Sequence, residues 1–458
     1  NVVNSLEGKI SGITITPSAG GAGGASKIIL RGNKSILGNS APLIVVDGVP
    51  MSNSTRGQKS FSTNNDDLTY SGVSEGSDPL SMINPDDIES MNVLKGANAA
   101  ALYGSQAANG VVMITTKRGK EGKLDINFTS NVTFDTPLLK PEIQNVYGAA
   151  LNAGGGITTM SWGDKMGGLT DLVQASPLDA RVFQNATHDI YLRNSAKDDV
   201  SEFFRTGVTT NNSISLSGGT EKIQTYFSYA NSHATGMVES NSYNRNTFAF
   251  RQSYKLWNRL HIDASMDYIQ TRTRNRPGGG TVGNPLYHLY LAARNIDMDY
   301  YKNNYVDPNG AWIGERGAYS HYQIRTDSEG NPLYDTNGAY LYDLYDANGY
   351  LSYTHRIPYY GEMQNWAYLE GGQNNPYWLI NRNNSVQKTD RVKGSITGKV
   401  DIYDGLTFQA RFSFDHTRYN SDSKRYATTF APSSMYTWGN YYVDNERTND
   451  IYTDYLLS

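Results

Sequence analysis

The sequence predicts a mainly β protein in which a small α+β domain precedes a series of long strands. Glycine and tyrosine are abundant, with 45 Gly and 34 Tyr among 458 residues, and only 18% of the residues are charged. This composition supplies many turns and many aromatic strand positions. Beyond residue 119, polar and apolar residues alternate over segments of roughly 10 to 13 positions, about twice the mean strand length of soluble proteins.

A unit of about 30 residues organises the N-terminal domain. It opens with Asn-Pro-Asp-Asp at 84–87, which predicts a turn because proline fixes φ and aspartate side chains can cap the next element. Residues 88–94 predict a short strand, and the alanine-rich stretch 97–108 predicts one or two helical turns. Asn-Gly at 109–110 ends the helix, and the β-branched residues 111–116 predict a buried strand. The unit therefore has the length of a compact βαβ-type crossover.

Several linked motifs run through this domain in a fixed order. Upstream of the unit stand Leu-Glu-Gly-Lys-Ile-Ser-Gly at 6–12, Leu-Arg-Gly at 30–32 and Pro-Leu-Ile-Val-Val-Asp-Gly-Val-Pro at 42–50. Within it, Asn-Pro-Asp-Asp-Ile-Glu-Ser is followed by Ala-Ala-Ala-Leu-Tyr-Gly-Ser and Ala-Ala-Asn-Gly-Val-Val. Together they closely resemble the plug domain of the SusC/RagA family of TonB-dependent outer-membrane transporters. Linked motifs are more specific than any one short motif.

The resemblance implies both a fold and a set of signature residues. Residues 1–119 would form an α+β plug domain, and residues 120–458 the N-terminal portion of a transmembrane antiparallel β-barrel of about 22 strands. The residues that carry the plug signature are Arg31, Gly32, Asp47, Gly48, Asn84, Pro85, Asp87, Glu89, Lys95, Tyr103, Gly104, Asn109 and Gly110.

The alternating segments have the length of tilted membrane-crossing strands. Apolar residues take every second position most clearly in 124–134, 260–268, 392–402 and 406–414. A soluble sandwich would also alternate, so strand length, aromatic strand ends and the preceding domain decide for the barrel. About seven to nine such strands occur, too few to enclose a plug, and the chain is therefore expected to supply only part of a barrel.

Turns and long insertions separate these strands. Short turns are predicted at 218–221, 256–259 and 403–405, as at the periplasmic end of a barrel. Two long regions, about 137–202 and about 272–390, are predicted to be extracellular loops. The second carries three Asn-Gly signals, which predict a small hairpin meander.

The residues predict no catalytic, metal or cofactor site. The seven histidines lack metal-ligand spacing, and there is no cysteine. The adjacent carboxylates of Asp86 and Asp87 suit capping better than acid–base work. The Gly20–Gly24 loop lacks the Gly-Lys-Ser/Thr ending of a phosphate cradle, so a flexible turn is predicted. The net charge is −4 and the sequence has no block of basic residues, so it predicts no basic surface that could bind nucleic acid.

The resemblance implies energised import across the outer membrane. TonB would pull on a periplasmic segment that normally lies before the region beginning at Asn1, and a SusD-like lipoprotein would cap the extracellular mouth. Oligosaccharide is the more common cargo, with oligopeptide close behind. Candidate substrate contacts are the insertion 51–81 and Trp162, Trp312, Trp366, Tyr368, Tyr377 and Trp378. Aromatic faces stack on sugars, but they also pack loops and meet protein partners.

Two other interpretations stay open on the residues alone. One is a TonB-dependent transporter of a metal chelate or vitamin, against which the plug motifs argue. The other is a soluble all-β carbohydrate-binding or adhesion protein. Detergent dependence separates this second alternative from the barrel, because a barrel requires an outward apolar band.

Overall fold

The computed structural model describes residues 13–17, 21–24, 26–30, 32, 41–51, 82–94, 103–138, 140–150, 161–167, 173–177, 187–193, 195–277, 283–313, 327–329, 331–334, 359–368, 373–429 and 440–458. Strands dominate these residues. The longest α-helices among them have seven residues, and no helix in the described part is long and apolar enough to cross a membrane.

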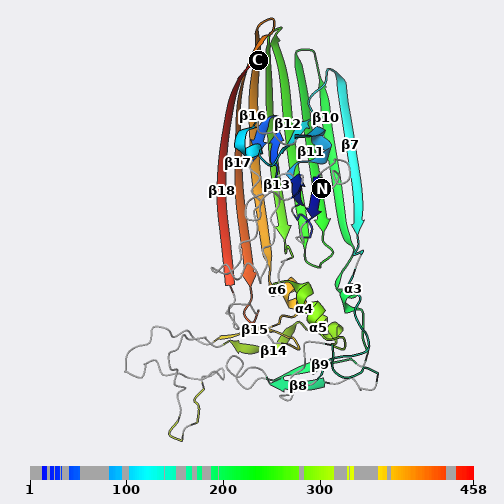
Figure 1. Ribbon diagram of the computed structural model, residues 1–458. Coiled ribbons are helices and arrows are strands. Elements are labelled where there is room, and N and C mark those ends of the chain that lie inside the picture. The colour runs from blue at the N-terminus through cyan, green and yellow to red at the C-terminus, as the bar shows by residue number, and fades with distance from the viewer. Residues whose placement is uncertain are drawn as a thin grey trace.

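Eight long strands form one antiparallel sheet (Figure 1). They are β7 (Gly122–Asp135), β10 (Gly207–Gly219), β11 (Ile223–Thr235), β12 (Ser242–Trp257), β13 (Leu260–Arg274), β16 (Ser385–Tyr403), β17 (Leu406–Arg425) and β18 (Asn440–Leu457). Each pairs with the next of these along the chain, so β7 and β18 are the edges. β16 and β17 reach 19 and 20 residues, longer than predicted, because the hydrogen-bond ladder continues past the apolar positions into polar ones.

The two faces of this sheet differ because successive side chains point to opposite sides. On the outer face, register aligns Phe128, Ile214, Tyr229, Phe248 and Tyr268 across five strands. Phe128 is 70% exposed and Phe248 is 40% exposed. The inner face carries mostly polar or small side chains, and it contacts the N-terminal domain. The outer face therefore has the apolar band that membrane strands require.

The N-terminal domain contains a four-stranded sheet in the order β4-β3-β6-β5. The strands are β3 (Leu43–Val46), β4 (Val49–Met51), β5 (Ile88–Leu94) and β6 (Val111–Thr116), and β1 (Ile13–Pro17) pairs with β2 (Ser26–Leu30) beside them. The core of the domain consists of Ile15, Ile28, Leu30, Ile44, Val46, Met51, Val112 and Ile114. Figure 1 places the domain, in blue, against the middle of the long strands.

The predicted βαβ-type crossover is wrong. β5 and β6 are antiparallel neighbours, and the parallel partner of β6 is β3. Of the predicted helix, the described part is a single 3₁₀ turn, η4 (Gly104–Ala107), and residues 97–102 lie outside the described residues. A parallel crossover needs a dozen or more residues, usually a full helix. The turn predicted at 84–87 is present as the 3₁₀ turn η3 (Pro85–Asp87).

A separate cluster, which we call the loop cluster, lies at the end of the long strands opposite their short turns (Figure 1). It contains α3 (Asp199–Phe203), α4 (Pro285–Leu291), α5 (Met298–Asn303), α6 (Pro376–Arg382), and the strand pairs β8 (Val173–Pro177) with β9 (Thr187–Tyr191) and β14 (Val306–Ile313) with β15 (Tyr359–Gln364). These elements lie within the two predicted long insertions. Within the predicted meander region, β14 and β15 fall in the described residues, and the Asn-Gly signals at 337–338 and 348–349 do not. The predicted domain bounds, 1–119 and 120–458, stay predictions.

Candidate functional site

The plug-signature residues gather mainly at the turns of the N-terminal domain. Asp47 and Gly48 form the β3–β4 turn with φ of 51° and 81°. The Asp47 carboxylate accepts hydrogen bonds from the backbone N–H of Thr116 at 2.9 Å and from its hydroxyl at 2.7 Å. This bond pair ties the turn to the end of β6. Arg31 and Lys95 lie outside the described residues, and Gly32 is exposed with a φ of 81°.

The second group of signature residues surrounds β5 and β6. Asn84 caps η3 by accepting a hydrogen bond from the N–H of Asp86 at 3.3 Å, and Pro85 is the first residue of that turn. Glu89 is exposed on β5, and Tyr103 with Gly104 begins η4.

Gly110, after Asn109, has a φ of 97°, and a Cβ there would lie 2.7 Å from Cδ1 of Leu30. Glycine is therefore required at 110 by both conformation and space.

Among the hydrogen bonds between the N-terminal domain and the inner face of the large sheet, two join buried side chains at or next to signature residues. The hydroxyl of Tyr226, on β11, donates to the carboxylate of buried Asp87 at 2.8 Å. The Nε of Arg251, on β12, donates to the hydroxyl of Thr116 at 2.7 Å. We call these the docking contacts. Since Thr116 also binds Asp47, the second contact continues into a signature residue.

Arg251 is itself fixed by a buried ion pair. Its second guanidinium nitrogen lies 2.9 Å from Asp267, on β13, and the two side chains are only 8% and 17% exposed. Farther along the same face, Arg391 pairs with Asp415, and their side chains are 6% and 15% exposed. Removing one partner of such a pair leaves an uncompensated buried charge, whereas the intact pair contributes little net stability.

Sequence reasoning missed these sheet residues. Tyr226, Arg251 and Asp267 lie at the polar positions of alternating segments, and alternation assigns such positions only to the barrel interior. The available signal was the presence of arginine and aspartate at strand positions that face the barrel interior. Where that interior holds a domain instead of water, such side chains need buried partners.

The glycine-rich loop meets the large sheet near the loop cluster. Ala22 donates its N–H to Oδ1 of Asn241 at 3.0 Å, and Arg276 donates to the carbonyl of Gly23 at 3.1 Å. A Cβ on Gly21 would approach that same Asn241 oxygen to 2.8 Å, and its φ is 62°. The described residues 21–24 form a turn. The absence of a side chain at Gly21 and Gly23 lets the backbone approach Asn241 and Tyr243 closely.

Four of the six predicted aromatic contacts are buried inside the loop cluster. Trp366 and Trp378 are 0% exposed, and Tyr368 and Tyr377 are 2% and 5% exposed. Trp378 donates its indole N–H to Thr429 at 2.8 Å, and the Tyr368 hydroxyl accepts from the N–H of Ala293 at 2.9 Å. Burial raises the pKa of Tyr368 and Tyr377. In this structure the four rings pack the loops together.

The two remaining aromatic candidates differ from these four. Trp162 is 75% exposed, with its ring centroid 6.4 Å from that of Tyr147. Trp312 lies on β14 and pairs with Tyr360, and its side chain lies outside the described residues. The insertion 52–81 also lies outside them. Substrate contact by Trp162 and Trp312 therefore stays a prediction.

A buried network of amides locks the loop cluster. Asn375 caps α6 by accepting from the N–H of Tyr377 at 2.8 Å, and its own N–H donates to Oε1 of Gln364 at 2.8 Å. The N–H of Gln364 donates to the hydroxyl of Thr428 at 3.0 Å. All these groups are buried and paired, so the cluster holds one arrangement. It forms a rigid frame beyond the ends of the long strands.

The described residues contain no group of three or more His, Cys, Asp or Glu side chains that could hold a metal ion.

Comparisons with known proteins agree with this geometry. Residues 1–111 match the family model of the TonB-dependent receptor plug domain. The chain is 28% identical over 290 residues to the TonB-dependent receptor SusC of Bacteroides thetaiotaomicron, covering 62% of this chain and 24% of that protein. It is also 28% identical over 334 residues to a TonB-dependent receptor of Formosa agariphila, covering 72% of this chain and 26% of that receptor.

Solved structures agree at the level of fold. The RagAB peptide transporter superimposes with a TM-score of 0.53 at 18% identity, covering 99% of this chain and 43% of that one. The chain thus spans about a quarter of the length of the curated relatives it matches, and under half of this structural neighbour.

A plug-type domain docked on the polar inner face of an antiparallel sheet with an apolar outer face defines a TonB-dependent receptor. Within that class, the linked plug motifs and the likeness to SusC both indicate the SusC/RagA type, and the proteins that the chain matches are TonB-dependent receptors, not enzymes. The plug-domain match and the apolar outer face of the sheet both argue against the soluble binding module. The N-terminal domain is hereafter called the plug.

Proposed function

We propose that this protein imports oligosaccharides across the outer membrane, driven by TonB and assisted by a SusD-like lipoprotein lid. The observation that carries the proposal is the polar docking of the plug, through Asp87–Tyr226 and Thr116–Arg251. If apolar packing held the plug, its separation from the sheet would expose that apolar contact surface to water. Hydrogen-bonding groups can instead exchange their partners for water, so separation under force costs less.

The orientation of the protein follows from connection lengths. Long loops of outer-membrane barrels are extracellular and short turns are periplasmic. The turns between β10 and β11, β12 and β13, and β16 and β17 are short, so we assign their end to the periplasm. The loop cluster then faces outwards, where its rigid frame suits a seat for the lipoprotein. TonB would act from the periplasm.

The cargo proposal rests on sequence likeness. The chain resembles SusC in sequence, and the resemblance favours oligosaccharide. Oligopeptide is the second candidate, because a structure of matching fold is a peptide transporter. Trp162 and Trp312 are the proposed aromatic contacts with either cargo. The four buried aromatic residues would act by holding the loops in place.

The test is purification of the full-length protein from native outer membranes in mild detergent, followed by mass spectrometry of co-purifying proteins and small molecules. A SusD-like lipoprotein with bound glycan is the expected result. Bound peptide would shift the cargo to the second candidate. A protein without a lipoprotein, and whose uptake of labelled glycan is unchanged when TonB is deleted, would overturn the proposal.

A further inference from the structure

On the outer face of the sheet, rows of paired residues across adjacent strands change from apolar to polar toward the loop cluster. One apolar row across β12, β13, β16, β17 and β18 consists of Phe250, Met266, Gly394, Phe414 and Ile451. Four positions nearer the loop cluster, the paired residues are Asn246, Gln270, Asp390, Arg418 and Arg447. The next row on this face consists of Asn244, Arg272, Lys388, Asn420 and Asn445.

These two polar rows bring four cations together on adjacent strands: Arg272, Lys388, Arg418 and Arg447 are all exposed. Within the described part of the chain, no ion pair joins any of them to a carboxylate. The carboxylate in these rows, Asp390, already accepts hydrogen bonds from Tyr268 and Gln270, each at 3.1 Å. The rows therefore present positive charge to whatever surrounds them.

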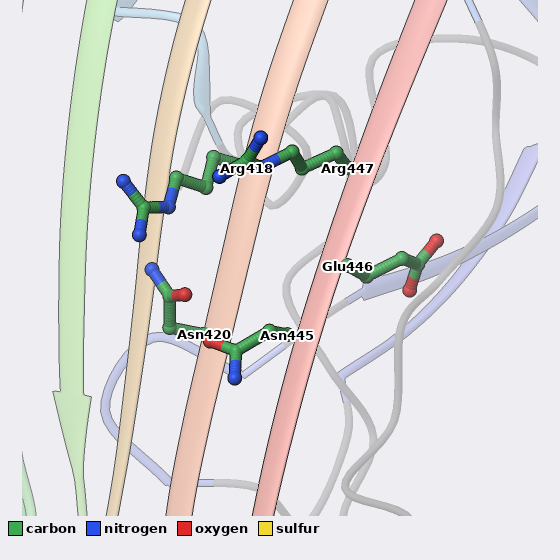
Figure 2. Close-up of a pocket in the computed structure, with 5 residues that line it drawn as sticks. All are labelled: Arg418, Asn420, Asn445, Glu446 and Arg447. Atoms are coloured by element: carbon green, nitrogen blue, oxygen red, sulfur yellow. The ribbon is translucent and has the colours of Figure 1, made fainter.

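Arg418 and Arg447 line a pocket with Asn420, Asn445 and Glu446 (Figure 2). Figure 2 shows both guanidinium groups extending to one side, across the neighbouring strands, and the Glu446 side chain extending to the other. Glu446 pairs in register with buried Tyr419, on the inner face. Guanidinium and amide N–H groups remain on the outer side. Such donors match the several acceptor oxygens of a phosphate group.

The depth of the pocket identifies the source of the phosphate. Along β13 the apolar positions run from Leu260 to Tyr268, about 27 Å at roughly 3.4 Å per residue. For a strand tilted by about 35–45°, this length spans roughly 20 Å across the membrane, close to the apolar band of about 25 Å in outer-membrane barrels. The four cations begin just beyond that band on the loop-cluster side, which is the level of lipid headgroups. Fixed cations at this level attract anionic headgroups.

We propose that Arg272, Lys388, Arg418 and Arg447 form a docking site for the phosphate groups of a membrane lipid in the leaflet on the loop-cluster side. The lipid chains would lie on the apolar rows, and the pocket between Arg418 and Arg447 would hold a phosphate. This inference rests on the proposed membrane placement, but it makes no use of transport.

The test titrates diphosphorylated lipid A into the detergent-solubilised full-length protein and counts bound lipid by native mass spectrometry. Removing two charges with R418Q/R447Q should weaken binding roughly thirtyfold at low salt. The variant R418K/R447K keeps the charge and should stay within about fivefold of the wild type. A matched control, K123Q/K222Q, removes two exposed cations at the short-turn end and should bind like the wild type.

Three results would overturn the inference: equal lipid affinity of R418Q/R447Q and wild type, equal affinity for lipid A stripped of its phosphates, or inorganic phosphate binding as tightly as the lipid. Because these residues are exposed on the outer face, the glutamine variant should fold, and its melting temperature in detergent checks this. Lipid binding without cargo import would leave this inference standing while overturning the proposed function. Import without charge-dependent lipid binding would do the reverse.

Discussion

The plug interface is held by polar contacts, whereas the loop cluster is held by a buried aromatic core. Between the plug and the sheet, the docking contacts are hydrogen bonds from Tyr226 and Arg251, and the surrounding inner face is polar. In the loop cluster, Trp366, Tyr301 and Ile296 are fully buried, and amides lock the helices. The first interface can be parted and rewetted, whereas opening the second would expose aromatic surface. The difference predicts that, in the proposed import, the plug separates from the sheet more readily than the loop cluster opens.

The largest expected effect is on the stability of the loop cluster. Trp366→Ala removes a fully buried ring that meets Tyr301 edge-on at 5.1 Å, and it should destabilise the loop cluster by about 3–5 kcal/mol. Limited proteolysis of segment 283–382 and thermal unfolding in detergent would measure this. The matched control is Trp162→Ala, which removes a 75% exposed ring and should change stability by less than about 0.5 kcal/mol. Equal effects of the two variants would contradict the packing described for the cluster.

The next largest effect is on the contact between the plug and the large sheet. Arg251→Met deletes the bond to Thr116 and leaves Asp267 as an unpaired, mostly buried charge, a change that costs roughly 3 kcal/mol or more. We expect faster amide hydrogen exchange across residues 111–116. The double variant R251M/D267L removes both charges and should recover much of the stability while leaving the plug contact broken. If exchange in β6 returns to the wild-type rate in the double variant, Thr116–Arg251 does not hold the plug.

A smaller change sharpens the distinction between docking and folding. Tyr226→Phe keeps the ring and removes the hydroxyl that binds Asp87 at 2.8 Å. Loss of a hydrogen bond to a charged group costs about 1.5–3 kcal/mol. The plug should exchange amide hydrogens faster around residues 85–88, while the loop cluster keeps its wild-type protection. Altered protection in the loop cluster would show that the two regions are coupled.

The smallest effect comes from an ion pair outside both regions. Lys255 and Glu221 are joined at 2.8 Å near a short turn, and Glu221 is 69% exposed. Glu221→Gln should leave the stability nearly unchanged, because exposed ion pairs are screened by solvent. Urea unfolding at low and high salt would measure it. If Glu221→Gln destabilised the protein as much as Arg251→Met, burial would not explain why the two ion pairs differ in their effect on stability.

Much of the fold could be predicted from residue patterns. Seven of the eight long strands follow from alternation, because one face is apolar and the other polar. β18 (Asn440–Leu457) escaped because residues such as Asn445 and Arg447 occupy its outer face beyond the apolar rows. The direction of β5 was missed since pairing between strands is set by the tertiary path, not by local propensity.

The candidate site was less predictable. The signature motifs pointed to Asp47 and Asp87, but their partners Thr116 and Tyr226 lie 69 and 139 positions away in sequence. Arg251, which binds Thr116, lies 135 positions from it. The aromatic residues Trp366 and Trp378 occur in a polar, glycine-rich insertion, which suggested exposed binding groups. Residue type alone does not reveal burial inside a loop, because an insertion with its own core has no strand or helix periodicity to indicate it.

The strand order of the large sheet has a consequence for its assembly. From β10 to β13, successive strands are joined by short turns, so this meander can form by adding one hairpin at a time. Between β13 and β16 the chain detours through segment 275–384, whose closure has an entropic cost that rises with its length. At the base of that detour, Ser385 donates its N–H to Oδ1 of Asn275 at 2.9 Å. We expect that packing of the loop cluster before these strands pair would bring β16 within reach of β13 and lower the entropic cost of closing this segment.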